Sequence, residues 1–360
     1  MARLGDICEI LDSKRIPITA SNRKAGIYPY YGANGIQDYV DDYIFDDELV
    51  LLAEDGGHFG STEKPIAYRV SGKCWVNNHA HVLKPKEMVD VDYLCYSLMF
   101  RDVSNIVNGA TRQKLTQADM KEIDIPLCSL EEQQDIVKRL NQVFLLMNLR
   151  KQQLAKLDEL VKSRFVELFG HKGYLEDTLL NLCNIIDYRG KTPEKVEQGL
   201  PFITAKNVKM HQMNLEPREY ISKETYDKVM VRGFPKEGDV VFTTEAPLGN
   251  VCRIPHFDTE FYIGQRIVTL QTETLEPIYL EYALSSDDFK TKYTGKSSGS
   301  TVTGIRVRLL EQLTIPVPPK ALQEQFVAFV EQIDKSKSEI QKSLEKLETL
   351  KKALMQKYFG

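Results

Sequence analysis

The sequence lacks the features of a membrane or secreted protein. It has no uncharged apolar run of the ~20 residues that a membrane-spanning helix needs, so we expect no membrane span. The first residues, MARLGDICEIL, do not have the layout of a secretory leader. The six cysteines lie far apart and include no C-x-x-C pair. We therefore expect free thiols in a reducing, cytoplasmic environment.

Signatures of catalysis are also scarce. There is no G-x-x-x-x-G-K-[ST] loop, which argues against ATP-driven motor work by this chain. The only Pro-Pro pair, Pro318–Pro319, is preceded by Val317 and followed by Lys320, so it does not match the [DN]-P-P-[FYW] loop of amino-methyltransferases. His79 and His81 would share one face of a strand without a third ligand nearby, so we expect no metal site. We predict no catalytic residues and no cofactor of the chain's own.

What the composition does show is a soluble globular protein. The chain has 360 residues, of which 42% are hydrophobic and 27% charged. This length suggests two or three domains. The net charge of −4 points weakly away from nucleic acid, so any DNA contact would need locally basic surfaces.

An internal repeat organises the sequence. IPLCSLEEQQDIV begins at Ile125 and IPVPPKALQEQFV begins at Ile315, and both copies continue to a Phe-Gly pair that ends at Gly170 or Gly360. The same separation of 190 residues holds at both places (125 to 315, and 170 to 360). Weaker collinear matches continue upstream: LGDICEILD matches LNLCNIID, and VNNHAHVL matches IGQRIVTL. A duplicated unit explains these matches better than coincidence does.

Each copy ends in a long predicted helix. No Pro or Gly interrupts residues 130–168, and apolar residues recur there at alternating spacings of three and four, as they do in the second copy. At ~1.5 Å per residue each helix would be about 60 Å long and would need a partner of equal length. The two helices should therefore pair antiparallel. The predicted interface consists of Val137, Leu140, Phe144, Met147, Leu154 and Val161 in the first helix and Val330, Ile333, Ile340, Leu344, Leu347 and Leu354 in the second.

These elements predict four segments in an α+β fold. We expect a mixed module over residues 1–128, a helix over 129–170, a second mixed module over 171–316 and a second helix over 317–360. Short β-rich runs and helical stretches alternate within each module. The β-rich runs are Glu48–Ala53, Ile66–Val70, Asp239–Thr244 and Arg266–Leu270, and the helical stretches are Asp92–Val103 and Pro277–Thr291. The prediction is two similar domains joined by two long antiparallel coiled-coil helices, with pseudo-two-fold symmetry.

Two repeat-equivalent loops are basic and rich in hydroxyl groups. Lys290–Arg308 has five basic residues and no acidic one, and Arg101–Lys121 is its counterpart. Cationic side chains, hydroxyls and backbone N–H groups are what phosphate oxygens bind. A solvated surface loop is the alternative, but the matching positions favour function. The predicted DNA-binding residues here are Thr111, Arg112, Gln113 and Lys114 in the first copy and Lys296, Ser300, Thr301, Arg306 and Arg308 in the second.

Other polar clusters occupy matching places in the two copies. Side chains of Asn, Gln, Arg and Lys read base edges in the major groove, although in loops they more often cap or solvate a turn. The matching places carry different side chains, as two readers of different sequences on one scaffold would. The candidates are Lys14, Arg15, Asn34, Asn77, Asn78 and His79 in the first copy and Arg189, Lys191, Thr192, Lys206, Asn207, Gln265 and Arg266 in the second.

This layout resembles the specificity (S) subunit of type I restriction–modification enzymes over the whole chain. YRGKTP at Tyr188–Pro193 and SGST at Ser298–Thr301 look like sequences common in the recognition domains of that family. The first copy departs from the pattern, because DSKRIP at Asp12–Pro17 lacks the glycine. The resemblance implies two target recognition domains that each read one half of a split double-stranded DNA site, with the two helices as spacers.

The resemblance also implies partners. The helices would dock two methyltransferase subunits that use S-adenosylmethionine, and cleavage would need restriction (motor-nuclease) subunits that use ATP and Mg. The leading alternative is a coiled-coil scaffold that assembles proteins without reading DNA. An enzyme with an unrecognised active site and a transcription regulator are weaker alternatives, since neither a methyltransferase loop nor a helix-turn-helix signature is present.

Overall fold

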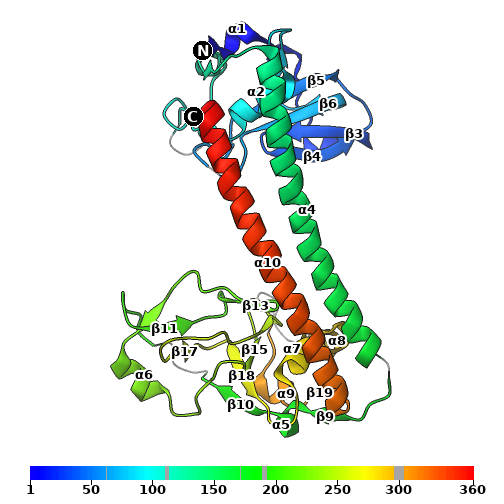
Figure 1. The fold of residues 1–360 in the computed structure, drawn as a ribbon, viewed down its shortest axis with the longest axis vertical. Helices are drawn as coiled ribbons and strands as arrows, with labels where there is room; N and C mark the ends of the chain where they lie inside the picture. Colours follow the sequence, from blue (N-terminus) through cyan, green and yellow to red (C-terminus); the bar gives the residue numbers. More distant parts are fainter. Residues whose placement is uncertain (62, 110–112, 171, 189–192, 296–303) are drawn as a thin grey trace. The chain divides into compact units, whose positions relative to one another are not determined.

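The computed structural model describes residues 1–61, 63–109, 113–170, 172–188, 193–295 and 304–360. The chain divides into two compact units, drawn in Figure 1. The first unit is Met1–Gln152 with Ile340–Gly360, and the second is Gln153–Glu339. Each of the two long helices therefore contributes one part to each unit.

The first unit is built on a six-stranded sheet with the order β2-β7-β5-β6-β3-β4. Neighbouring strands are antiparallel except β3 and β6, which pair in parallel at Tyr30–Trp75 and Tyr31–Val76. The strands are β2 (Cys8–Ile10), β3 (Ala25–Gly32), β4 (Gly35–Val40), β5 (Phe45–Ala53), β6 (Ala67–Val76) and β7 (Ala80–Pro85). The run Leu49–Ala53 of β5 is fully buried, and this part of the strand is accordingly apolar throughout.

Short elements surround this sheet. A two-residue strand, β1 (Ala2–Arg3), pairs with β8 (Asp124–Ile125), so the beginning and end of the module lie together. The short helices are α1 (Leu4–Ile7), η1 (Asp12–Lys14), η2 (Ala20–Asn22), α2 (Val91–Met99) and α3 (Gln117–Lys121). Helix α2 packs on β5 and β6 and is buried along most of its length.

The second unit repeats the central part of this plan. Its main sheet has the order β10-β18-β15-β16, the same order as β2-β7-β5-β6. The strands are β10 (Asn184–Asp187), β15 (Val240–Thr243), β16 (Val251–Arg253) and β18 (Ile267–Gln271), and β9 (Glu176–Thr178) pairs with β19 (Thr314–Pro316) as β1 pairs with β8. Both units are therefore built on one scaffold, which confirms the α+β fold with two similar domains.

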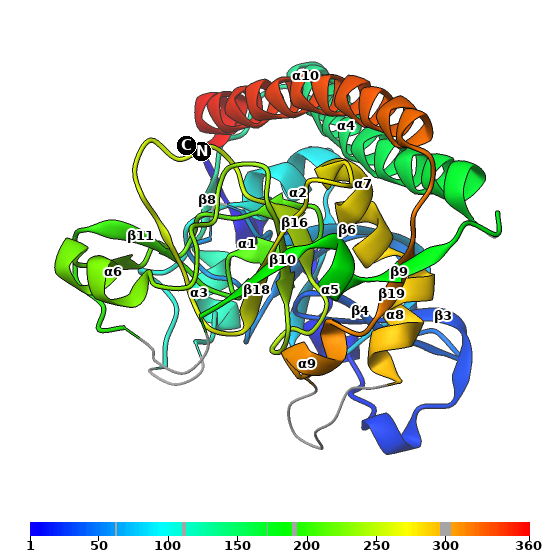
Figure 2. The same cartoon turned by 90° about the horizontal axis from the view of Figure 1, so that it is seen from below.

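The remaining elements of the second unit extend this scaffold. Strand β11 pairs in parallel with β17, just as β3 pairs with β6. The extra strands are β11 (Leu200–Ile203), β12 (Val208–Lys209), β13 (Gln212–Met213), β14 (Tyr220–Ile221) and β17 (Tyr262–Ile263). The helices are α5 (Leu179–Leu182), α6 (Lys223–Val229), α7 (Pro277–Ser285), α8 (Asp287–Thr294) and α9 (Val307–Leu310). Figure 2 shows α7 between the sheet and the long helices, the place that α2 has in the first unit.

The long helices are α4 (Leu130–Phe169) and α10 (Lys320–Phe359), each of 40 residues. Ser129 and Glu132 form a reciprocal capping box at the start of α4: the Ser129 hydroxyl accepts from the Glu132 N–H, and the Glu132 carboxylate accepts from the Ser129 N–H. Pro319 directly precedes α10, where its missing N–H costs nothing. Local chemistry thus sets both starting points.

The helices pair antiparallel in each unit. In the first, Val143 and Met147 of α4 form a cluster with Leu344 of α10, against which Leu347 and Leu354 also pack. In the second, Val161 of α4 shares a core with Val330 and Ile333. In the first unit the N-terminal half of α4 therefore contacts the C-terminal half of α10. In the second unit the C-terminal half of α4 contacts the N-terminal half of α10.

Some predicted seam residues serve the modules as well. Val137 and Leu140 are buried in the core of the first module, with Phe144 packed against it, and Leu154 and Ile340 are half-buried. Val143, which the sequence analysis did not include, lies three residues after Leu140 and four before Met147, next to the predicted Phe144.

The structure also bears on the cysteines and on the apolar character of the helices. All six cysteines are free, and burial raises the pKa of the Cys8, Cys74, Cys95, Cys183 and Cys252 thiols to about 12. No helix among the described residues is both long and apolar enough to cross a bilayer.

Candidate nucleic-acid interface

Three segments of the first unit meet where strand β5 ends. The N–H of Glu54, the residue after β5, donates to the carbonyl of His79 at 2.9 Å, and the N–H of Leu115 donates to the carbonyl of Glu54 at 2.7 Å. This backbone ladder joins the turn before β7 to the basic loop that precedes α3. The predicted residues Asn78, His79, Gln113 and Lys114 are thereby brought to one edge of the sheet.

Two more predicted residues reach the same edge. Asn34, in the turn between β3 and β4, donates from Nδ2 to the carbonyl of Gly56 at 3.0 Å, and the Gly56 N–H lies 3.4 Å from the carbonyl of Gln113. Lys14 belongs to η1, whose neighbour Arg15 donates to the carbonyl of Ala80 at 2.7 Å. The exposed members of this set are Lys14, Asn34, Asn78, Gln113 and Lys114.

A buried ion network supports this edge. His81 is 1% exposed; its Nδ1 lies 2.6 Å from Asp12 Oδ2 and its Nε2 lies 2.9 Å from the carbonyl of Leu115. Both partners are acceptors, so a ring with a proton on each nitrogen satisfies the arrangement. Arg15 Nη1 lies 2.5 Å from Glu54 Oε2, and Lys114 Nζ lies 2.9 Å from Glu54 Oε1. The network joins η1, β7 and the basic loop.

The network keeps its carboxylates ionised. Burial alone would raise the pKa of Asp12, but hydrogen bonds from His81 and the Val82 N–H, with the charges of His81 and Arg15, lower it overall. Burial likewise opposes ionisation of Glu54, and hydrogen bonds from Arg15 and Lys114 outweigh it, so its pKa is also lowered. These groups are arranged as ion pairs.

The same network bears on metal binding. Ligand atoms of Asp12, Glu54 and His81 lie within 4.8 Å of one another, and this is the only such trio in the described part of the chain. The fold thus gives His81 two carboxylate neighbours that sequence spacing does not reveal. Arg15 and Lys114 already neutralise Glu54, and a cation there would face their positive charges. The donor set fits an ion network better than a metal centre.

The second unit has the same backbone ladder. The N–H of Thr244, the residue after β15, donates to the carbonyl of Arg266 at 2.9 Å, and the Ile305 N–H donates to the carbonyl of Thr244 at 2.9 Å. Thr244 therefore corresponds to Glu54, Arg266 to His79 and Ile305 to Leu115. The aligned segments VNNHAHVL and IGQRIVTL also pair His79 with Arg266, so the sequence repeat and the strand register give the same correspondence.

Each unit pairs the matching basic residue with a carboxylate. His79 Nδ1 lies 2.8 Å from Asp55 Oδ1, and Arg266 Nε lies 3.0 Å from Glu245 Oε1. Asp55 directly follows Glu54 in the sequence, and Glu245 directly follows Thr244. Both also form an isolated β-bridge to the basic loop, Asp55 to Lys114 and Glu245 to Gly304. A carboxylate thus stands between the basic loop and a candidate base reader in both units.

Several candidates of the second unit line one hollow. Its volume is about 230 Å³, and Lys206, Gln265 and Arg266 lie along it. Lys195 and Glu219, which the sequence did not single out, lie there too, with Lys195 Nζ 2.8 Å from Glu219 Oε2. The hollow is thus a concave surface with three cationic side chains, lying at the end of the central strands.

Arg266 has an unusual backbone. Its φ of 74° lies in the left-handed region, which non-glycine residues seldom adopt. Such a conformation costs roughly 1–3 kcal/mol and occurs often at functional sites. With this backbone conformation, the Arg266 side chain lies beside Glu245 and lines the hollow.

Three predicted readers lie in the structure where they bond other groups of the protein. Asn77 is 3% exposed; its Oδ1 accepts from the His79 N–H at 2.8 Å and its Nδ2 donates to Gln37 at 3.1 Å. Asn207 is 1% exposed and bonds Thr204, Asn214 and Pro217. Arg15 is held in the ion network. These bonds tie the three side chains to groups of their own unit, and both amide hydrogens of Asn207 are used.

The remaining candidates divide into two groups. Arg306 and Arg308 are exposed, Arg306 just before α9 and Arg308 within it, next to the ladder residue Ile305. The other predicted residues lie outside the described residues: Thr111, Arg112, Arg189, Lys191, Thr192, Lys296, Ser300 and Thr301.

The functional residues that sequence reasoning missed are mainly acidic. Asp55 and Glu245 hold the candidate readers, and Lys195 and Glu219 line the hollow. Asp55 and Glu245 follow β-rich runs at matching places, so a search for paired opposite charges between the copies could have found them. Lys195 and Glu219 come together through the isolated bridge between their neighbours Val196 and Tyr220, and no local signal predicts that.

Two apolar grooves occupy matching places, one in each unit. A groove of about 510 Å³ in the second unit lies between the end of α4 and α7 and includes Phe165, Phe169 and Tyr282. A groove of about 530 Å³ in the first unit lies between the end of α10 and α2 and includes Phe359 and Tyr96. The Phe-Gly pairs that end the sequence repeat thus line equivalent surfaces.

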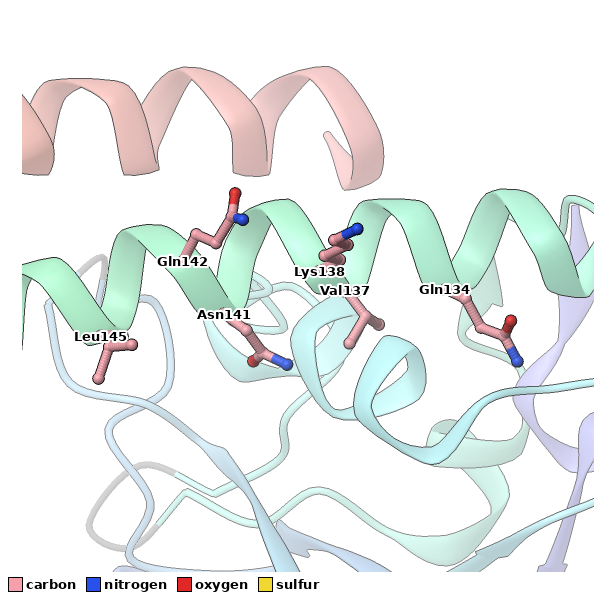
Figure 3. A pocket seen from close by; sticks show the side chains of 6 residues that line it. All are labelled: Gln134, Val137, Lys138, Asn141, Gln142 and Leu145. Atoms are coloured by element: carbon pink, nitrogen blue, oxygen red, sulfur yellow. The ribbon is translucent and has the colours of Figure 1, made fainter.

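A third groove lies in the first unit. It has a volume of about 380 Å³ and runs along α4, where Val137, Asn141 and Leu145 line it (Figure 3). Leu145, Leu146 and Leu149 are exposed on this helix. The matching positions of α10 are Lys335, Ser336 and Glu339, so the two long helices differ in this stretch.

Comparison with known proteins identifies similar chains. Residues 1–159 and 177–352 match the model of the type I restriction modification DNA specificity domain. A Haemophilus influenzae protein named as a type I restriction enzyme specificity subunit is 28% identical over 348 residues, covering 92% of this chain and 86% of its own length. The MjaVIII specificity subunit of Methanocaldococcus jannaschii is 23% identical over 398 residues, covering 99% and 90%.

Solved structures show the same fold. The S subunit of a type I restriction–modification system from M. genitalium superposes with a TM-score of 0.60 at 15% identity, covering 99% of this chain and 95% of that one. A chain of a type I system studied for complex assembly and conformational transition gives a TM-score of 0.55 at 20% identity, covering 99% and 96%.

Proposed function

Because the chain belongs to the family of type I restriction–modification DNA specificity domains, we propose that it binds an asymmetric, bipartite site in double-stranded DNA. Each unit would read one half of the site, and the stretch between the halves would be non-specific. The chain itself would supply recognition, and catalysis would lie in its partners.

One observation carries this proposal. The two units present the same backbone ladder at the ends of equivalent strands, but with different side chains on it: His79 beside Asp55 in one and Arg266 beside Glu245 in the other. A duplicated scaffold that carries different polar groups at matching positions suits two readers of two different sequences. Arg306, Arg308 and Lys114, next to these readers, supply charge for phosphate contacts.

The proposal includes partners. The two equivalent apolar grooves, at Phe169 in one unit and Phe359 in the other, would seat two copies of a methyltransferase subunit. Those subunits would bind S-adenosylmethionine and act on an extrahelical base. Restriction by the full complex would require motor-nuclease subunits that use ATP and Mg, and assembly would take place in the cytoplasm.

A pool of randomised DNA duplexes tests the proposal. The chain is purified with its methyltransferase subunit, incubated with the pool, and the bound duplexes are sequenced. We expect enrichment of two short specified blocks at a fixed separation. Binding without any enriched sequence would support the alternative, a coiled-coil scaffold that assembles proteins without reading DNA.

A further inference from the structure

The pair Arg266–Glu245 leaves part of the arginine available to a ligand. Glu245 Oε1 lies 3.0 Å from Nε and forms an ion pair at this one of the three guanidinium nitrogens. The two terminal Nη groups form the opposite edge of the planar group. The Arg266 side chain is 51% exposed and lies on the hollow of the second unit, so this edge can meet a ligand.

Backbone contacts also hold both residues of the Arg266–Glu245 pair in place. The carbonyl of Arg266 accepts the Thr244 N–H at 2.9 Å, and Glu245 is bridged to Gly304. These contacts fix both partners on the ends of neighbouring strands, β15 and β18. With its backbone fixed by the strands and a carboxylate beside Nε, the guanidinium loses less freedom on binding than an arginine without such contacts would.

The chemistry of such an edge selects one base. Two parallel N–H donors match the O6 and N7 acceptors that guanine shows in the major groove, whereas adenine offers N7 beside a donor amino group. Phosphate would also accept two N–H bonds, but it needs no such orientation. Gln265 and Lys206, which line the same hollow, can contact neighbouring base edges.

We propose that Arg266 reads a guanine in the half-site bound by the second unit, with Glu245 as the residue that positions it. This inference rests on the proposed function and assigns one base of the target. The equivalent pair in the first unit, His79 and Asp55, reads a base in the other half-site.

Selection from the randomised duplex pool, with the chain and its methyltransferase subunit, tests the assignment. Arg266→Gln exchanges the guanidinium for an amide, which suits the N6 and N7 positions of adenine. We expect this variant to change one G·C pair of one block to A·T and to leave the other block unchanged. Arg266→Ala should lower the preference for G at that pair by roughly 10- to 100-fold.

Arg218 provides a matched control. Its Nε also lies 2.9 Å from a glutamate, Glu216, and its side chain is 65% exposed, but it does not line the hollow. Arg218→Gln should leave both blocks unchanged. His79→Ala should relax one position of the block that Arg266→Gln leaves intact.

The outcomes separate the inference from the proposed function. If the wild-type chain enriches no motif, the proposed function is wrong and the inference falls with it. If the wild type enriches two blocks and Arg266→Gln keeps both, the inference alone is wrong. If both Arg266 variants weaken binding equally to all sequences, Arg266 contacts phosphate, and the inference is likewise wrong.

Discussion

The side-chain oxygen of Gln133 accepts the backbone N–H of Asp90 at 2.8 Å. Its Nε2 donates to the carbonyls of Met88 and Cys128, so one buried amide ties the first turn of α4 to the N-cap of α2. Gln323 repeats this at the start of α10, accepting the Glu276 N–H at 2.9 Å and donating to Pro318. Each long helix is thereby fixed to the helix that covers its module.

Gln133→Ala and Gln323→Ala should each be strongly destabilising. Either change leaves buried backbone groups without a partner, which costs about 2–4 kcal/mol. The midpoint of urea unfolding, followed by circular dichroism, measures the loss. The exposed neighbours Gln134 and Gln325 provide controls, and their alanine variants should unfold like the wild type. Equal midpoints for the buried and exposed variants would contradict this account.

The ion network of the first unit should lose its contribution in acid. The pKa values of Asp12 and Glu54 are lowered from 3.8 and 4.5, so their stabilisation is present above those values. It is lost as the pH falls below them, through the lower pKa values of the folded state. The double variant Asp12→Asn, Glu54→Gln should therefore be less stable than the wild type at pH 7.

The difference in unfolding midpoint between wild type and this double variant should shrink towards pH 3. Glu87→Gln changes an exposed carboxylate of the same unit and should match the wild type throughout. A difference for the double variant that is the same at pH 7 and pH 3 would mean that the ionisation of these carboxylates does not stabilise the unit.

The exposed arginines beside the ladder of the second unit should contact phosphate. Arg306→Ala and Arg308→Ala should each weaken DNA binding at all sequences and reduce the slope of log K against log salt concentration by about 1. Fluorescence anisotropy at several salt concentrations gives this slope. Lys228→Ala removes an exposed charge on α6, away from the ladder, and should leave the slope unchanged. Unchanged slopes for both arginine variants would remove this surface from the DNA interface.

The long helices should set the separation of the two half-sites. Deleting one heptad from the middle of each, residues 147–153 and 338–344, keeps the apolar seam in register. At ~1.5 Å per residue the helices shorten by about 10 Å, or about three base pairs. Sequencing of DNA selected by the deletion variant should show a shorter gap between unchanged blocks. An unchanged gap would contradict the spacer role, and Lys151→Ala is a control that preserves the length.

The elements with strong local signals could be predicted from the sequence. The predicted helix over 129–170 corresponds to Leu130–Phe169, because the capping box and the absence of Pro and Gly define it locally. The β-rich runs at Glu48–Ala53 and Arg266–Leu270 fall within or next to β5 and β18. The helical stretch Pro277–Thr291 divides into α7 and α8, since the Ser286 hydroxyl caps a new helix by accepting the Phe289 N–H.

The site was less predictable, because the same residue types serve turns and ligands. Asn34 is exposed and donates to the carbonyl of Gly56, whereas Asn77 is buried and donates to Gln37, and both bonds are tertiary contacts. The link between Asp12 and His81 spans most of the first module and depends on the pairing of β2 with β7. Sequence spacing carries no information on such contacts. For His79 and Arg266 the sequence repeat did carry such information, because it aligns two residues that the backbone ladders place at equivalent positions.

Methylome sequencing of cells that co-express the chain with its methyltransferase subunit tests the central claim most directly. We predict methylation at one asymmetric motif of two specified blocks with a fixed gap, and no methylation when the chain is omitted. Methylation at a single uninterrupted motif, or the same pattern without the chain, would contradict recognition of a split site by the two units.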